Sequence, residues 1–162
     1  MIDASTLILL AKSGLLDSFL ENFPKTPFIA AEVEREATAK ASFDAILIKE
    51  RINGKKIVVK DVKNKKLVEK VSKDFRLHLG EAETIALCVE NSWQLVGTDD
   101  YNAIKACIVL QIAYTSAIDI LAKLCKEKIL SKKEALTKLE LLSYFGRYSD
   151  EIIEDVKNRL EE

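Results

Sequence analysis

Short apolar runs alternate along the chain with longer segments of helical periodicity. The strand-like runs lie at residues 1–2, 28–30, 57–59, 95–96 and 109–114. Helical patterns occupy 6–12, 15–22, 31–53 with a break, 80–90, 100–107, 116–126, 133–142 and 150–160. Lys and Val interleave around the third run, which favours an edge strand. The alternation predicts an α/β fold, rich in helix, around a central parallel sheet of about four to five strands.

Length and composition fit one globular domain. The chain has 162 residues, of which 48% are hydrophobic and 31% charged, with only five Gly and two Pro. We therefore expect a single domain over residues 1–162, with the C-terminal helices (about 116–162) packing on it. The formal net charge of −1 neither supports nor excludes an RNA substrate.

The cysteines and the N-terminal segment indicate a cellular compartment. Cys88, Cys107 and Cys125 are far apart and have apolar neighbours, which is typical of core residues in a reducing compartment. The opening segment has no basic leader, and a polar Asp-Ala-Ser-Thr interrupts its apolar residues. We expect a cytoplasmic protein without a signal peptide or membrane span.

Acidic residues follow the predicted strands at several separate points. Asp3 follows the first run, "AAEVEREA" and "LGEAETIAL" open two helices, and "TDD" follows Leu95-Val96. The carboxyl ends of parallel strands meet at one edge of the sheet, where ligands bind. Two carboxylates 4 Å apart repel by about 4 kcal/mol, so such a cluster favours a cation. Oxygen ligands without Cys or His predict Mg²⁺ or Mn²⁺ and phosphodiester hydrolysis.

Together these segments resemble the PIN-domain nucleases over almost the whole chain. "DASTLILLAKSGLLDSF" is similar to the opening Asp-x-Ser/Thr segment of that family, "VEREA" to its Val-x-x-Glu, "LGEAETIAL" to its Gly-Glu-x-Glu helix and "VGTDDYNAIKAC" to its Thr-Asp-Asp block. The resemblance implies a three-layer α/β/α fold and a Mg²⁺- or Mn²⁺-dependent endoribonuclease. The C-terminal segment, including "FGRYSDEIIEDV", further resembles a prokaryotic subgroup related to toxin ribonucleases. This implies RNA as substrate, a small antitoxin protein as a candidate partner, and a homodimer.

The resemblance also implies roles for individual residues. The catalytic, metal-binding set is Asp3, Glu36, Glu83 and Asp99, with Glu81 and Asp100 as further candidate metal ligands. An acidic residue at a helix start is also stabilising without any function, because it caps the helix or favours its dipole. We expect one of the two adjacent aspartates to face the metal and the other to cap a helix. Glu81 and Glu83 flank opposite sides of one buried stripe, and the family pattern favours Glu83.

Other polar residues near these segments have weaker assignments. Ser5 and Thr98 are candidates for orienting the metal ligands by hydrogen bonds. The candidate contacts with RNA phosphates are Lys12, Arg76 and Lys105, for which solvated surface charge is the alternative. Trp93 and Tyr101 are candidates for base stacking or for the core. We assign His78 no catalytic role.

The short first strand keeps a second function open. Only Met1 and Ile2 precede Asp3, whereas the family usually has a longer first strand, so the α-amino group is expected near the metal site. A catalytically degenerate PIN-like module that binds RNA or protein without cleavage is therefore the alternative to a nuclease. A phosphoryl-accepting receiver-like domain also uses acidic residues and Mg²⁺, but its aspartate and lysine cannot both be placed in this sequence.

Overall fold

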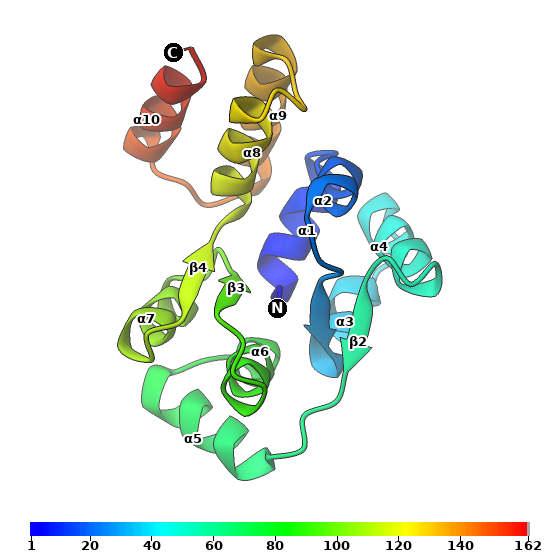
Figure 1. Cartoon of the computed structure of the whole chain (residues 1–162), viewed down its shortest axis with the longest axis vertical. Coiled ribbons are helices and arrows are strands. Elements are labelled where there is room, and N and C mark those ends of the chain that lie inside the picture. Colours follow the sequence, from blue (N-terminus) through cyan, green and yellow to red (C-terminus); the bar gives the residue numbers. More distant parts are fainter. Residues whose placement is uncertain (162) are drawn as a thin grey trace.

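The computed structural model describes the backbone of residues 1–161 and the side chains of residues 1–160. The helices are α1 (Ala4–Lys12), α2 (Leu16–Asn22), α3 (Ala31–Thr38), α4 (Phe43–Asn53), α5 (Lys65–Phe75), α6 (Leu79–Glu90), α7 (Tyr101–Val109), α8 (Ala117–Lys126), α9 (Lys132–Phe145) and α10 (Asp150–Glu161). The strands are β1 (Phe28–Ala30), β2 (Val58–Lys60), β3 (Leu95–Gly97) and β4 (Ala113–Thr115). This helix-rich α/β architecture confirms the predicted fold class (Figure 1).

The strands form two parallel pairs, and the first three residues of the chain join them. Strand β1 pairs with β2, and β3 pairs with β4. Ile2 forms a parallel bridge with Gly97, and its N–H donates to the carbonyl of Phe28 at 3.0 Å. The Asp3 N–H in turn donates to the Gly97 carbonyl at 2.9 Å. The spatial order is therefore β2, β1, residues 1–3, β3, β4, and the short first strand that the sequence predicted does connect the sheet.

Two predicted elements differ from the structure. The run at 109–114 was expected to be a strand, but α7 continues to Val109 and β4 comprises only Ala113–Thr115. Helix α5 is not among the helical segments predicted from periodicity. Its sequence is rich in Lys, and its buried residues are Val68 and Val71. It begins where the Asn64 side chain accepts a hydrogen bond from the Leu67 N–H at 3.1 Å, which is a common way to cap a helix.

Helix α1 lies at the centre of the hydrophobic core. It contacts α2, α3, α4, α8 and α9. Its Leu7 and Leu10 side chains are fully buried, and so is Leu121 on α8. At one end of the molecule α8, α9 and α10 pack together, as Figure 1 shows. The N-terminal segment that carries Asp3 is thereby fixed from several sides.

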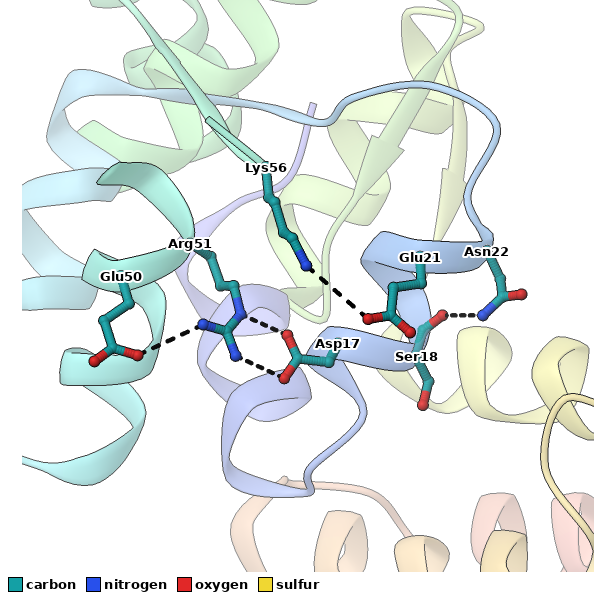
Figure 2. A network of polar contacts seen from close by, with 7 residues as sticks. All are labelled: Asp17, Ser18, Glu21, Asn22, Glu50, Arg51 and Lys56. Atoms are coloured by element: carbon teal, nitrogen blue, oxygen red, sulfur yellow. Dashed lines mark hydrogen bonds and ion pairs between the residues drawn. The ribbon is translucent and has the colours of Figure 1, made fainter. Parts of the chain in front are cut away.

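An ion-pair network connects α2 to α4 on the surface (Figure 2). The Arg51 guanidinium donates two hydrogen bonds to the Asp17 carboxylate, at 2.6 and 2.8 Å. It also lies 3.5 Å from the Glu50 carboxylate. The bidentate geometry holds the two helices in one relative orientation.

No helix in the described part of the chain combines the length and the apolar character that crossing a bilayer requires.

We predict that Leu10→Ala lowers the free energy of unfolding by about 3 kcal/mol, because it leaves a cavity beside the central helix. Leu79→Ala is the matched control, since the Leu79 side chain is half exposed. It should cost about 1 kcal/mol or less. Urea unfolding followed by circular dichroism measures both changes. Equal losses in the two variants would contradict the central position of α1.

Candidate active site

The order of the strands reverses between residues 1–3 and β3. From the first strand the chain builds outward through β1 and β2, and then returns to add β3 and β4 on the other side. In an open parallel sheet, ligands bind at such a switch point, beyond the carboxyl ends of the strands. Asp3 ends the first strand, and Asp99 follows β3. The topology thus places these two aspartates where a ligand site is expected.

The Asp3 carboxylate is buried and accepts hydrogen bonds at both oxygens. Its Oδ1 accepts the Ser5 hydroxyl at 2.8 Å and the Thr6 N–H at 2.9 Å. Its Oδ2 accepts the Thr98 hydroxyl at 2.5 Å. Asp3 is therefore the N-cap of α1, as its alternative role predicted, and the same side chain also reaches across to the loop after β3.

The Asp99 carboxylate is held by three segments that are far apart in sequence. Its Oδ2 accepts the Thr6 hydroxyl at 2.5 Å and the Ala117 N–H at 3.0 Å. Its Oδ1 accepts a short hydrogen bond from the Tyr148 hydroxyl. Thr6 thus joins the two aspartates, because its N–H donates to Asp3 and its hydroxyl donates to Asp99.

Burial makes both carboxylates hard to ionise. Desolvation raises the pKa of Asp3 to about 7, although the hydrogen bonds from Thr98, Thr6 and Ser5 oppose the rise, and the negative charge of Asp99 adds to it. The pKa of Asp99 is also raised, mainly by burial, with a smaller contribution from the charge of Asp119. Two desolvated carboxylates that share one threonine gain stability from a proton or from a cation.

Each carboxylate has acceptor capacity for about one more partner. A carboxylate offers about four acceptor positions. Asp3 and Asp99 each accept three hydrogen bonds from the protein, which leaves about one position on each. A hydrated Mg²⁺ commonly uses one or two carboxylates, with water and substrate oxygens as its other ligands. The pair therefore fits a hard divalent ion by its donor chemistry.

A second group of acidic residues lies at the start of α6. The Glu36 carboxylate is so close to Gly80 that a Cβ at that position would lie 2.9 Å from its Oε1. Glu81 accepts the His78 N–H at 2.9 Å in a capping box. The negative charges of Asp100 and Glu36 both contribute to raising the pKa of Glu81, after burial as the main cause. Asp100 and Glu36 thus both act electrostatically on Glu81.

Asp100 and His78 have structural roles at helix starts. The Asp100 Oδ1 accepts the N–H groups of Asn102 and Ala103, at 2.8 and 2.9 Å, and so caps α7. His78 occupies the N-cap position of α6, where its backbone N–H makes the bond to Glu81. Asp100 therefore caps a helix, as we expected of one of the two adjacent aspartates, and Asp99 contacts the residues around Asp3. That Asp99 faces a metal stays a prediction.

Glu83 is buried but makes its contacts elsewhere. Its Oε2 accepts the Glu32 N–H at 3.2 Å, in the first turn of α3, whose N-cap residue Ala30 has no capping side chain. Its Oε1 lies 3.4 Å from the Lys65 ammonium. Among the described residues, no hydrogen bond or ion pair joins Glu83 to Asp3 or Asp99. The geometry favours Glu83 as a cap that a second helix supplies to α3.

The structure does not assemble the four predicted ligands into one cluster. Within residues 1–160, no three His, Cys, Asp or Glu side chains form a group that could hold a metal ion. Asp3 and Asp99 share one set of contacts, Glu36 lies beside Gly80, and Glu83 faces Lys65. The complete ligand set of Asp3, Glu36, Glu83 and Asp99 therefore stays a prediction.

The remaining sequence candidates have defined surroundings. Ser5 and Thr98 both donate to Asp3, as the orienting role requires. The Lys12 ammonium lies 5.2 Å from the Phe145 ring centre, and the Lys105 ammonium lies 4.4 Å from that of Tyr101. Arg76 has a left-handed conformation at the end of α5, and its carbonyl accepts the Asn102 side-chain amide at 3.4 Å.

Two further contacts bear on sequence-based interpretations. The Trp93 ring stacks on Phe28, with ring centres 4.8 Å apart, which makes it a packing residue of the sheet rather than a free stacking platform. The α-amino group of Met1 donates to the Leu95 carbonyl at 3.1 Å. Leu95 begins β3, whereas Asp99 follows its end. The amino group therefore binds at the opposite end of β3 from Asp99.

Comparison with protein families decides the classification. A family model described as a PIN domain matches residues 1–162. The chain belongs to the PIN-domain family. No curated protein and no solved structure gives a significant match. PIN domains are generally nucleases that use divalent metal ions, so a nucleic acid substrate and a cation site are expected of this PIN domain as well.

Sequence reasoning missed two residues of this PIN domain's site. Thr6 was treated only as the beginning of a helix, and its position three residues after an N-cap aspartate indicates the N–H contact to Asp3 but not the hydroxyl contact to Asp99. Tyr148 gave no local signal, because its partner lies 49 positions earlier in the chain. Contacts of this kind depend on the assembled fold.

We predict that Asp3→Asn flattens the pH dependence of stability in the absence of metal. The pKa of Asp3 is about 7 in the folded protein, above its ordinary value of 3.8. Between these values the unfolded chain releases a proton that the folded protein keeps, so the free energy of unfolding falls as the pH rises, by up to about 1.4 kcal/mol per pH unit.

Asparagine cannot release that proton, and the variant should lose less stability over the same interval. Urea unfolding of both proteins in EDTA, at several pH values between about 4 and 7, measures the two slopes. Identical slopes would contradict the raised pKa of Asp3.

Proposed function

We propose that this PIN domain is a Mg²⁺- or Mn²⁺-dependent endoribonuclease whose metal is held by Asp3 and Asp99. The observation that carries the proposal is the pair of carboxylates, Asp3 buried and Asp99 partly buried, which Thr6 joins at the switch point of the sheet. Both residues belong to the set of four that the family resemblance selected. When bound, the cation would activate a water molecule and stabilise charge on the phosphate oxygens.

The chain's own residues orient the two ligands. Ser5 and Thr98 fix the Asp3 carboxylate, and Thr6 fixes both aspartates relative to each other. Hydrogen bonds of this kind hold a ligand in the rotamer that the metal needs. Desolvation of the pair strengthens its attraction for a cation, because the local dielectric constant is low.

We propose that Glu36 and Glu81 extend the acidic site at the start of α6, with Asp100 beside them. The negative charges of Asp100 and Glu36, which contribute to raising the pKa of Glu81, support this grouping. Glu83 has the role of positioning α3, the helix that carries Glu36, through its bond to the Glu32 N–H. In this assignment Glu81 faces the acidic site, and Glu83 contacts the start of α3 instead.

Single-stranded RNA is the substrate that the start of α7 suits best. The Tyr101 side chain is 68% exposed and directly follows Asp100, and the Lys105 ammonium lies over its ring. An exposed aromatic ring stacks on an unpaired base, and a neighbouring lysine contacts the backbone phosphate.

The proposals of a small antitoxin partner and of a homodimer rest on the subgroup resemblance. Exposed apolar residues such as Ile108 and Val109 on α7 are compatible with a protein partner.

A module that binds without cleaving is the second candidate function. It is favoured by the observation that each of the two aspartates already accepts three hydrogen bonds from the protein, and that the described residues contain no group of three metal ligands. Calorimetric titration with Mn²⁺ separates the two functions. Absence of binding, with the fold intact, would favour the module.

We predict that Asp3→Asn and Asp99→Asn each lower the rate of RNA cleavage by about 100-fold or more, because each removes a charged metal ligand. Asp61→Asn is the control, since Asp61 is exposed and distant in sequence from the site segments. Cleavage of a labelled single-stranded RNA with Mn²⁺, with and without EDTA, measures the effect. Undiminished cleavage by both site variants would reject the assignment.

A second prediction distinguishes the two glutamates of α6. Glu81→Gln should weaken Mn²⁺ binding by about tenfold, while its amide still serves the capping box. Glu83→Gln should leave Mn²⁺ binding within about twofold. It should lower the free energy of unfolding by about 1 kcal/mol, because it loses the ion pair with Lys65.

Electron paramagnetic resonance of free Mn²⁺ and urea unfolding provide the two measurements. The reverse pattern, with Mn²⁺ binding sensitive only to Glu83→Gln, would restore Glu83 as the direct ligand.

A further inference from the structure

The connection between α9 and α10 brings a tyrosine hydroxyl into the site. Tyr148 lies in this connection, which passes close to the point where β4 leads into α8 (Figure 1). Its hydroxyl donates to Asp99 Oδ1. No other hydrogen bond to this oxygen comes from residues 1–160. The C-terminal helices thus reach the same carboxylate that α1 and α8 contact.

The three donors are divided between the two oxygens of Asp99. Thr6 and Ala117 both donate to Oδ2. Contacts at one oxygen leave the carboxylate free to rotate, because the terminal torsion of an aspartate has a broad distribution. The Tyr148 hydroxyl holds the second oxygen and so fixes the plane of the group. Asp3, by comparison, has both of its oxygens fixed without any help from the C-terminal helices.

The chain turns tightly so that this ring can pack. A Cβ on Gly146 would lie 2.5 Å from Tyr148 Cε2 and 2.8 Å from the Leu142 carbonyl oxygen. The φ angle of Gly146 is −92°, which any residue adopts, so its own backbone conformation does not require glycine. The space that the missing side chain leaves is occupied by the tyrosine ring.

We propose that Tyr148 is a positioning residue that sets the Asp99 carboxylate for metal binding, so that α9 and α10 complete the active site. This inference rests on the proposed function, since it assigns Tyr148 to the same metal centre. It goes further by giving the C-terminal helices a role in activity. The hydroxyl acts through Asp99 and contacts neither the metal nor the RNA.

Tyr148→Phe tests the role of the hydroxyl, because it keeps the ring that packs against Gly146. Tyr144→Phe is the matched control: it removes a hydroxyl from the nearby end of α9, from a side chain that is 81% exposed. Both full-length variants are compared with the unmodified protein. The measurements are Mn²⁺ binding by electron paramagnetic resonance, cleavage of a labelled single-stranded RNA over a MnCl₂ series, and thermal unfolding in EDTA.

For Tyr148→Phe we expect Mn²⁺ binding and kcat to fall by about tenfold each. The KM for RNA should be unchanged and Tm should stay within about 4 °C of the unmodified value. Tyr144→Phe should match the unmodified protein in all four quantities.

Two results would overturn the role of Tyr148 while the nuclease function stands. One is a Tyr148→Phe variant with normal Mn²⁺ binding and normal kcat. The other is a loss of activity that parallels a large fall in Tm and a raised KM, which indicates that Tyr148 only stabilises the fold. If the unmodified protein neither binds Mn²⁺ nor cleaves RNA, the proposed function itself fails, and this inference fails with it.

Discussion

Thr6 donates its N–H to the buried Asp3 and its hydroxyl to the partly buried Asp99, and the candidate site is organised around this double contact. It can form only if the first strand lies directly beside β3, because that pairing brings the start of α1 next to the loop after β3. Burying two carboxylates is unfavourable unless hydrogen bonds or a cation compensate. The pairing of the first strand with β3 is therefore the constraint that links the strand order, the cap of α1 and the acidic pair.

The sequence predicts the fold well where patterns are local. Apolar runs located β1, β2 and β3, and the break in residues 31–53 corresponds to the boundary between α3 and α4. Prediction from the sequence fails where tertiary contacts determine the secondary structure. Helix α5 buries only a narrow stripe against α6, so its Lys-rich sequence resembles a solvated segment. The apolar residues Ile108 and Val109 belong to an exposed helix end, and apolar character alone does not distinguish them from a strand.

The candidate site shows the same limit at the level of side chains. Asp3, Ser5 and Thr98 were found from the sequence, because a strand end followed by a helix start places such residues at the sheet edge. The choice between Glu81 and Glu83 depends on which neighbours the two sides of α6 meet. Periodicity predicts that the two residues point in different directions, but it does not predict that one direction leads to Lys65 and the first turn of α3.

In the proposed function, protons and a cation would compete for the two aspartates. A metal binds the ionised form of a carboxylate, so binding would be linked to the loss of a proton. Burial raises the pKa of Asp3 to about 7, which would place this exchange near neutral pH. The hydrogen bonds from Thr98, Thr6 and Ser5 limit the rise and keep the ionised form accessible. An acidic pair with fewer donors would retain its protons more strongly, and one with more exposure would attract the cation less. In the proposed function, the donors that surround Asp3 and Asp99 would thus set the balance between a stable fold and an available cation site.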